Sequence, residues 1–414
     1  MAQMNNYSSL LEVKVGLQFD DEVIPVGRLA SRDYKIYFEY DSDFISKGLE
    51  ISPLKLPLMN GLQSFDYNPF EGLPGVFNDS LPDGWGRLLF HRYVKSQHLL
   101  PEEFSPLDRL AYVGFTGLGA LVYQPDYSTV TEEQKEINLD SISLQTREVL
   151  EGEANEVLQE LIELNGSSAG ARPKALIGVN TFKDHIISGK HALPEKYEHW
   201  LVKFANTQDG NDAGTIEYVY ALMAQEAGIG MMPVHLFEAS TAAGYFSTQR
   251  FDTKGNTRLH MHTVSGLLHA DFRLPRLDYS DLIALTGVLT KDVREVEKMY
   301  RLAVFNVLSH NRDDHSKNFS FLMDKTGEWK LSPAYDLTFS SGPRGHQSML
   351  VMGEGQAPSV DHLLQLGAEA NLKTAQIHQI LERTKHALNQ WETLAKNYGV
   401  SDTNIKLIKS RITW

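Results

Sequence analysis

Residues 309–338, SHNRDDHSKNFSFLMDKTGEWKLSPAYDLT, decide the fold that we predict for this chain. They contain Asp313 and, five residues later, Asn318. The kinase catalytic loop H-R-D-L-x-x-x-N has the same offset, and Arg312 also precedes the Asp here, although Asn311 stands where that motif has His. A carboxylate can orient an attacking hydroxyl, and an amide oxygen can help to hold a divalent cation against phosphates. The spacing therefore favours a phosphoryl-transfer centre.

The residues after Asn318 predict a β-hairpin. Residues 319–323 are apolar like a strand, Gly327 marks a turn, and residues 329–331 are typical of a returning strand. Such a hairpin would bring Asp336 back beside Asn318, where kinases place the metal-binding Asp of their DFG motif.

Two other interpretations of this stretch stay open from the residues alone. Asp and Asn gather in solvated loops because their side chains bond the local backbone. Alternatively, His310 and His315 with Asp313 and Asp314 could be transition-metal ligands, although no further His or Cys follows at the usual spacing.

The composition is that of an ordinary globular protein with two or three domains, since 42% of the 414 residues are hydrophobic and 22% are charged. Cysteine is absent, which excludes disulfides and thiolate metal sites and fits a reducing cytoplasm. A net charge of −14 opposes bulk attraction to nucleic acid or anionic lipid. We expect neither a signal peptide nor a membrane span.

The first 125 residues predict a small β-rich module. Residues 13–19 alternate between apolar and polar side chains, as in the first strand of a β-meander. A helix is expected to begin near Asp83, with that side chain as its cap. A further helix and strand follow within residues 106–125, and residues 127–138 are the best candidate for a linker.

The middle of the chain carries a Gly-rich loop and a lysine in an apolar strand. Residues 147–164 have the spacing of an amphipathic helix, and GSSAGARPKALIGV follows at 166–179. Such a loop can bring backbone N–H groups close to phosphates, and Lys174 adds a cation. Lys203 lies in the strand HWLVKF, where an ammonium needs a partner unless the strand is at an edge. Glu217, on the next predicted helix, is the expected partner.

Together these parts resemble the HipA family of bacterial serine/threonine protein kinases, the toxin halves of toxin–antitoxin pairs. The segments that carry the resemblance are LPDGWGR (81–87), SAGARPKAL (168–176), LVKF (201–204), QRFD (249–252), RDDHSKNFS (312–320) and SPAYDL (332–337).

The resemblance implies an α+β, bilobal, protein-kinase-like fold. Its parts would be a β-rich N-terminal module (1–125), a kinase N-lobe-like part with the Gly-rich loop (145–255) and a helical C-lobe with the catalytic loop (256–414). It also implies phosphorylation of a protein Ser or Thr by ATP with Mg, an aminoacyl-tRNA synthetase being one substrate class. A HipB-like helix-turn-helix antitoxin would be the partner, with DNA reached only through it.

The resemblance also assigns roles to residues. Asp313 would be the base, Asn318 and Asp336 would hold Mg, Lys203 would contact the α and β phosphates, and Lys317 would reach the γ-phosphate. The remaining nucleotide-site residues would be Ser168, Ala169, Gly170, Ala171, Lys174, Gln249, Phe251 and His315.

One position departs from the family pattern. The family's autophosphorylated Ser immediately precedes the Gly-Ala of the loop, where this chain has Ala169. We expect Ser168 to take that role, with Ser167 second, and the added phosphate charge to expel the loop from the site.

Two alternatives to a protein kinase remain. A small-molecule phosphotransferase shares the same kind of core, although the N-terminal module favours a protein partner. A catalytically silent protein could also keep the fold and only sequester a partner.

Overall fold

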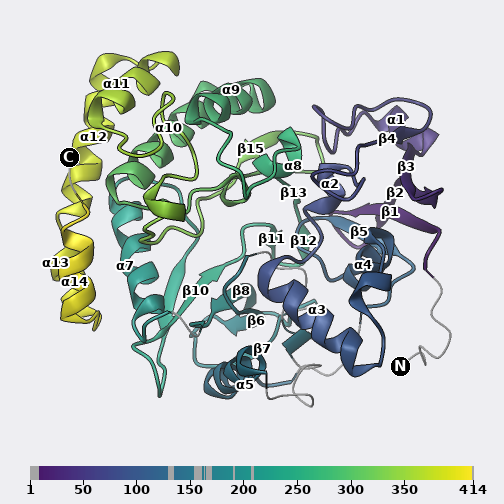
Figure 1. The fold of residues 1–414 in the computed structure, drawn as a ribbon, viewed down its shortest axis with the longest axis horizontal. Helices are drawn as coiled ribbons and strands as arrows, with labels where there is room; N and C mark the ends of the chain where they lie inside the picture. Colours follow the sequence, from purple (N-terminus) through teal and green to yellow (C-terminus); the bar gives the residue numbers. More distant parts are fainter. Residues whose placement is uncertain are drawn as a thin grey trace.

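The structure is a computed structural model that describes residues 9–128, 135–152, 161–162, 164, 170–189, 192–206 and 209–412. Strands and helices are interspersed along most of the chain, and the part after residue 331 is mainly helical. As Figure 1 shows, the N-terminal strands lie at one end of the molecule, the helices of the C-terminal third at the other, and a second sheet between and below them. The fold is of the α+β class.

The N-terminal part is built on a five-stranded sheet in the order β4-β3-β2-β1-β5. Val13, Val15, Leu17 and Phe19 are all buried, which confirms the alternating pattern. Its strands are β1 Glu12–Gln18, β2 Val23–Arg32, β3 Lys35–Tyr40, β4 Gln63–Ser64 and β5 Leu121–Gln124. Its helices are α1 Ser42–Lys47, α2 Gly75–Asn78, α3 Gly84–Ser96 and α4 Pro106–Val113, with a short 3-10 turn at Pro101–Glu103.

The second sheet has the order β7-β6-β8-β10-β9, all antiparallel, so β8 is its central strand. The strands are β6 Lys174–Asn180, β7 Ile186–Ser188, β8 Tyr197–Lys203, β9 Val234–Phe237 and β10 Tyr245–Gln249. Helix α7, Ala213–Glu226, contacts β9 and β10 of this sheet.

The helix predicted over residues 147–164 is wrong at its start, although the last described residues of that span, 161–162 and 164, are helical. Helix α5 is Leu139–Glu151, beginning eight residues earlier, because the Asn138 side chain accepts from the Ser141 N–H and caps it. Gly152 ends the helix in the left-handed region at φ 94°, which costs glycine little.

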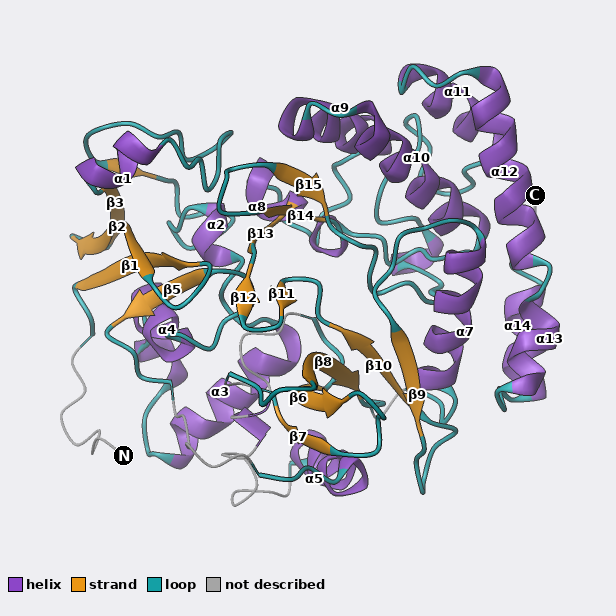
Figure 2. Ribbon diagram, turned by 180° about the vertical axis from the view of Figure 1, so that it is seen from behind, coloured by secondary structure: helices purple, strands orange, loops and turns teal. Residues whose placement is uncertain are grey.

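The C-terminal part combines a small sheet, β13-β14-β15, with a group of helices. Its strands are β13 His260–Thr263, β14 Ser320–Met323 and β15 Trp329–Leu331, preceded by the short pair β11 Thr253–Lys254 and β12 Thr257–Arg258. Its helices are α8 Val264–Leu268, α9 Tyr279–Thr290, α10 Val293–Leu308, α11 Val360–Glu369, α12 Thr374–Leu388, α13 Trp391–Asn397 and α14 Asp402–Lys409. Helix α12 packs on both α10 and α7, so the helical part reaches the second sheet through α7 (Figure 2). Among the described residues, every helix is too short or too polar to cross a bilayer.

Two hydrophobic cores connect these parts. One runs from the N-terminal sheet, through residues such as Phe38 and Phe77, into the helical part around Phe305. The other joins Trp85 and Leu89 of α3 to the second sheet. The N-terminal part therefore packs on both of the others, and the domain limits read from the sequence stay a prediction.

Asp79 links the N-terminal part to β13 and α8. Its Oδ2 accepts from the Thr263 N–H at 2.7 Å and lies 2.6 Å from His262 Nδ1, while its Oδ1 accepts from the Thr263 hydroxyl at 2.7 Å. His262 Nε2 in turn lies 3.0 Å from the Ser52 hydroxyl. A buried carboxylate is tolerated here because every partner is a directed polar group.

We therefore expect Asp79→Ala to lower the free energy of unfolding by about 3 kcal/mol, since it leaves His262 and Thr263 buried with unsatisfied polar groups. Urea unfolding of the full chain measures the difference. Asp21→Ala, at an exposed position, is the matched control and should change stability by less than about 0.5 kcal/mol. Equal stability of the two variants would contradict a structural role for Asp79.

Candidate active site

The predicted catalytic loop, residues 311–318, follows α10, and a hydrogen bond joins two of its residues. The Asn318 side chain donates from Nδ2 to the Asp313 carbonyl oxygen at 2.7 Å, so the Asp-to-Asn offset closes a compact turn. Asp313 is exposed at the mouth of the site. Desolvation by surrounding groups raises the pKa of Asp313 above its usual value, with His315 opposing the change and Asp336 adding to it.

The predicted hairpin is confirmed and brings Asp336 to this loop. Strands β14 and β15 pair Phe321 with Leu331, and Gly327 occupies the turn at φ 85°. The Tyr335 hydroxyl then donates to the Lys317 carbonyl oxygen at 2.7 Å, which places the segment before Asp336 against the catalytic loop.

Lys203 joins three separate elements at one point. Its Nζ lies 2.5 Å from Glu217 Oε1 on α7 and 2.5 Å from Asp336 Oδ1 after β15. The lysine side chain is 11% exposed and ends the central strand β8, so an exposed position on an edge strand is excluded. Burial alone would lower the pKa of Lys203, but the carboxylates of Asp336 and Glu217 outweigh it and raise the pKa. Burial would likewise raise the pKa of Asp336, but Lys203 and Lys174 hold it well below its usual range.

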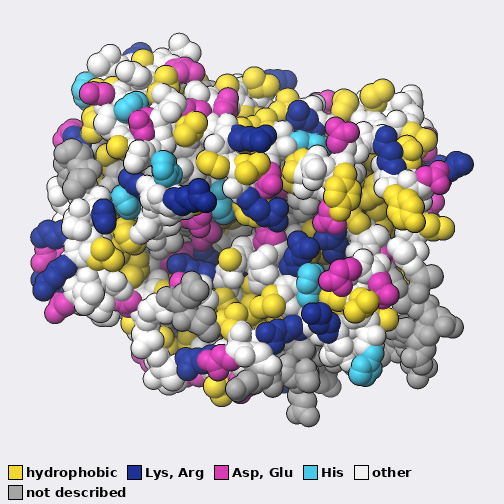
Figure 3. Space-filling view, in the orientation of Figure 1, with side chains coloured by type: hydrophobic (Ala, Val, Ile, Leu, Met, Phe, Trp, Pro, Cys, Tyr) yellow, Lys and Arg dark blue, Asp and Glu magenta, His cyan; other side chains and the backbone are white. Residues whose placement is uncertain are grey.

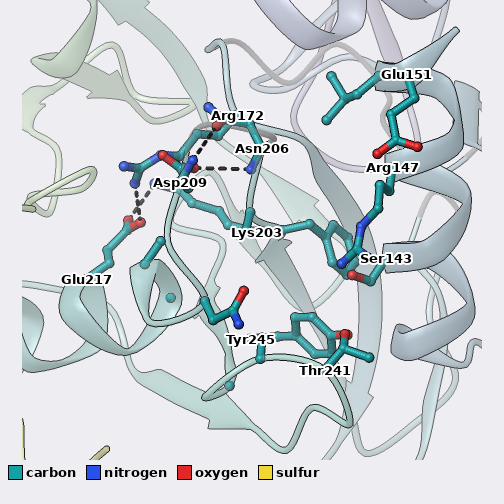
Figure 4. A pocket seen from close by; sticks show the side chains of 18 residues that line it. Ser143, Arg147, Glu151, Arg172, Lys203, Asn206, Asp209, Glu217, Thr241 and Tyr245 are labelled. Carbon is teal, nitrogen blue, oxygen red and sulfur yellow. Dashed lines mark hydrogen bonds and ion pairs between the residues drawn. The ribbon is translucent and has the colours of Figure 1, made fainter. Parts of the chain in front are cut away.

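Glu217 is shared between two cations. Besides Lys203, Arg172 from the segment before β6 lies 3.5 Å from Glu217 Oε2 and 3.2 Å from Asp209 Oδ2. These four side chains form one wall of a cavity of about 330 Å³ whose other wall is α5 and the turn before Tyr245 (Figure 4). Only 2% of the Glu217 side chain is exposed, so water cannot replace Lys203 and Arg172 as partners of its carboxylate.

The described end of the Gly-rich loop faces the same centre. Gly170 has a φ of 105°, and a Cβ there would lie 2.5 Å from Lys174 Nζ. Burial, with Lys203 nearby, lowers the pKa of Lys174 to about 8. Ala171 follows in this turn, whereas Ser167, Ser168 and Ala169 lie outside the described residues.

The other predicted nucleotide-site residues are Gln249, Phe251 and His315. Gln249 is the last residue of β10, and Phe251 follows it with its ring 5.3 Å from that of Tyr335. His315 packs on Phe272 with the ring centroids 5.1 Å apart. In the space-filling view, basic and acidic side chains gather beside the hollow near the middle of this face (Figure 3).

The side chains at this centre suit Mg better than a transition metal. No three His, Cys, Asp or Glu side chains within the described part of the chain are grouped to hold a metal ion, and His310 stacks on Phe339 instead. Asn318 and Asp336 offer an amide and a carboxylate oxygen, and Mg commonly takes only one or two protein ligands in addition to phosphates and water. The residues therefore fit Mg, which Asn318 and Asp336 would hold.

Two contacts at the site were not found from the sequence. Asp83 begins α3, as predicted, but the expected cap is wrong: its side chain makes no capping bond and instead accepts from Gly170 N–H and, at 2.6 Å, from Lys317 Nζ. The LPDGWGR segment was the available signal, but no sequence rule joins Asp83 to Gly170 and Lys317, which are 87 and 234 positions away.

The second contact involves Asp314, a candidate metal ligand in the sequence, which is instead buried behind Asp313. Its carboxylate accepts from the Tyr279 hydroxyl at 2.7 Å, from Gln347 Nε2 at 2.8 Å and from the Ser348 N–H at 3.1 Å. Burial raises the pKa of Asp314 to about 6. Residues 342–355 thus pack on the catalytic loop through Gln347 and Ser348.

A family model described as the HipA-like C-terminal domain matches residues 166–391, more than half of the chain, and one described as the HipA N-terminal domain matches residues 21–124. The chain belongs to the HipA family.

Among curated proteins, the serine/threonine-protein kinase toxin HipA of Shewanella oneidensis is 22% identical over 258 residues, which are 56% of this chain and 54% of that protein. The match thus spans about half the length of that relative. Among solved structures, one titled as the HipA, HipB and operator DNA complex of the Shewanella oneidensis MR-1 toxin–antitoxin system superposes with a TM-score of 0.68 at 15% identity, covering 96% of this chain and 95% of the other. This likeness shows the fold, which is the bilobal HipA-like, kinase-like fold with a β-rich N-terminal module.

We expect Lys203→Met to lower the free energy of unfolding by about 2 to 4 kcal/mol, because Glu217 would stay buried after losing its closest cation. Chemical denaturation measures the change. Lys330→Met is the control, since Lys330 is exposed and forms only a surface pair with Glu328 at 3.3 Å. If both variants unfold at the same denaturant concentration, the buried pairs do not stabilise the site.

Proposed function

We propose that this HipA-family protein is an ATP- and Mg-dependent serine/threonine protein kinase and the toxin component of a toxin–antitoxin system. The observation that carries the proposal is the position of Lys203 Nζ, 2.5 Å from both Glu217 Oε1 and Asp336 Oδ1. Kinases use a strand lysine paired with a helix glutamate to hold phosphates, and place a metal-binding Asp beside them.

The proposed roles follow from this arrangement. Lys203 and Lys174 would bind the phosphates of ATP, with the backbone of Gly170 and Ala171 beside them and Lys317 directed at the γ-phosphate. Mg, held by Asn318 and Asp336, would supply positive charge to the phosphate oxygens.

Asp313 would orient the substrate hydroxyl and accept its proton. As the hydroxyl oxygen bonds to the γ-phosphorus, the bond from that phosphorus to the β–γ bridging oxygen breaks and ADP leaves. A raised pKa makes the Asp313 carboxylate a stronger proton acceptor.

The adenine would bind at the segment after β10, beside Gln249 and Phe251. Phe251 supports this placement because its ring contacts Tyr335, whose hydroxyl bonds to the Lys317 carbonyl oxygen. His315, two residues after Asp313, would complete the set of nucleotide residues.

The proposed partners are an antitoxin and, through it, DNA. The superposed neighbour is titled as a complex with HipB and operator DNA, which supports a HipB-like helix-turn-helix antitoxin for this chain. A net charge of −14 makes direct DNA binding unfavourable, so DNA would be reached through that partner. A protein such as an aminoacyl-tRNA synthetase would be the substrate, in the cytoplasm.

Autophosphorylation is part of the proposal. Ser168, with Ser167 second, would accept the phosphate; both lie outside the described residues. The added negative charge would oppose rebinding of a loop that is meant to hold phosphates.

The central test replaces the proposed base. We expect Asp313→Asn to lower kcat for phosphate transfer from ATP by a factor of about 10² to 10⁴, because the amide cannot accept the proton. Transfer of radiolabelled γ-phosphate to the chain itself and to lysate proteins measures it.

The control for this test is Asp361→Asn, at an exposed position in the first turn of α11, which should keep wild-type activity. Equal background transfer by wild type and Asp313→Asn would favour a silent binding protein. Normal transfer to small metabolites alone would favour a small-molecule phosphotransferase.

A pH dependence follows from Lys174. Its pKa is lowered to about 8, so near pH 8 part of the nucleotide-free protein has lost this proton. Bound phosphates raise the pKa again, so ATP binding at pH 8 should take up a fraction of a proton, and affinity should fall as pH rises through 8.

Calorimetry in buffers of different ionisation enthalpy measures this proton uptake. Lys174→Met should abolish it, whereas Lys183→Met, on the turn before β7, should not. Unchanged uptake in Lys174→Met would show that another group titrates.

A further inference from the structure

The start of helix α3 in the N-terminal part lies against the Gly-rich loop. The Trp85 N–H donates to the Gly170 carbonyl oxygen at 3.1 Å, and the Gly170 N–H donates to Asp83 Oδ1. Gly84, between them, has a φ of 44°, and a Cβ there would lie 2.5 Å from the Gly170 carbonyl oxygen. This approach of two backbones is possible only with glycine at position 84.

The second carboxylate oxygen of Asp83 contacts the predicted catalytic loop. Lys317 Nζ lies 2.6 Å from Asp83 Oδ2, and the two side chains are 10% and 19% exposed, respectively. Burial would raise the pKa of Asp83, but Lys317 and the Gly170 N–H outweigh it and lower the pKa, so the carboxylate is ionised at neutral pH. One carboxylate thus contacts both the Gly-rich loop and the lysine placed for the γ-phosphate.

Asp83 orients the ammonium of Lys317, because the neighbouring aromatic ring does not. This ammonium also lies 4.9 Å from the centre of the Phe272 ring, a contact that attracts a cation but does not fix its hydrogen bonds. An ammonium has three N–H donors, so Lys317 can keep its bond to Asp83 while donating to a phosphate. The lysine would then enter the reaction already oriented.

We propose that Asp83 is a positioning residue of the nucleotide site, supplied by the N-terminal part: the Gly170 N–H orients its carboxylate, and the carboxylate orients Lys317 toward the γ-phosphate. This rests on the proposed kinase function. The N-terminal part then forms one wall of the ATP site. Binding of ATP would stabilise the packing of α3 against the Gly-rich loop, and that packing would strengthen ATP binding to the same extent, because such coupling is reciprocal.

A purely structural role for Asp83 would predict a different pattern. If the carboxylate only attached α3 to the rest of the protein, its loss would weaken ATP binding to the same extent with or without the Lys317 ammonium. If it acts through Lys317, its loss has no further effect once that ammonium is removed.

The experiment measures Mg-ATP binding to the full chain by calorimetry for wild type, Asp83→Asn, Lys317→Met and the double variant. We expect Asp83→Asn to raise Kd about tenfold, and the double variant to lie within about twofold of Lys317→Met alone. Asp20→Asn is the matched control. It makes the same chemical change in another ion pair from the N-terminal part, Asp20 to Lys325 at 3.3 Å, which is exposed and does not involve Lys317.

Two results would overturn the proposal while wild type still binds ATP: a wild-type Kd in Asp83→Asn, or losses that multiply in the double variant. If wild type binds no Mg-ATP, the kinase function itself fails, and this inference fails with it.

Hydrogen exchange on wild type tests the same proposal without any variant. Mg-ATP should slow exchange at the first turns of α3, beginning at the Trp85 N–H, and should leave α1 unchanged. Equal exchange of α3 with and without bound nucleotide would exclude the coupling.

Discussion

The ammonium of Lys203 is the point on which the rest of the structure depends. It stands at the end of the central strand of one sheet, and it is held by Glu217 from a helix and Asp336 from the segment after a hairpin. A buried ammonium is costly without partners, so both elements must arrive at their present positions. These ion pairs therefore fix the relative positions of the second sheet, α7 and the segment that carries Asp336.

The catalytic loop is held from behind by directed hydrogen bonds. Asp314 receives donors from α9 and from residues 347–348, while Tyr335 bonds the loop from the side of the hairpin. These bonds fix the position of the backbone that carries Asp313 and Asn318. Buried polar networks of this kind fix one geometry, because any other arrangement leaves a polar group without a partner.

The N-terminal part belongs to the working structure for the same reason. It meets the remainder through buried carboxylates: Asp79 at β13, Asp83 at the Gly-rich loop, and Asp252, which accepts from the Gly119 N–H at 2.7 Å and from Arg250. Apolar surfaces alone could slide on one another, whereas each carboxylate needs its donors in place.

The local sequence pattern was enough to predict many of the strands and helices of this protein. The meander of β1 to β3, the hairpin of β14 and β15, the strand with Lys203 and the helix with Glu217 follow from hydrophobic period and turn residues, which act over a few positions. The limits of α5 were missed because Asn138 and Gly152, as cap residues, outweighed the apolar spacing between 147 and 164.

The contacts of Asp83 and the burial of Asp314 were decided only by the tertiary structure. A carboxylate at a helix start has the same local options whether it caps the helix or reaches a distant lysine, and only packing brings Lys317 within its reach. Sequence alone determined which side chains could do chemistry here and in what order they come. Folding decided which of them meet, because an ion pair between residues 83 and 317 depends on distance in space and leaves no periodic trace along the chain.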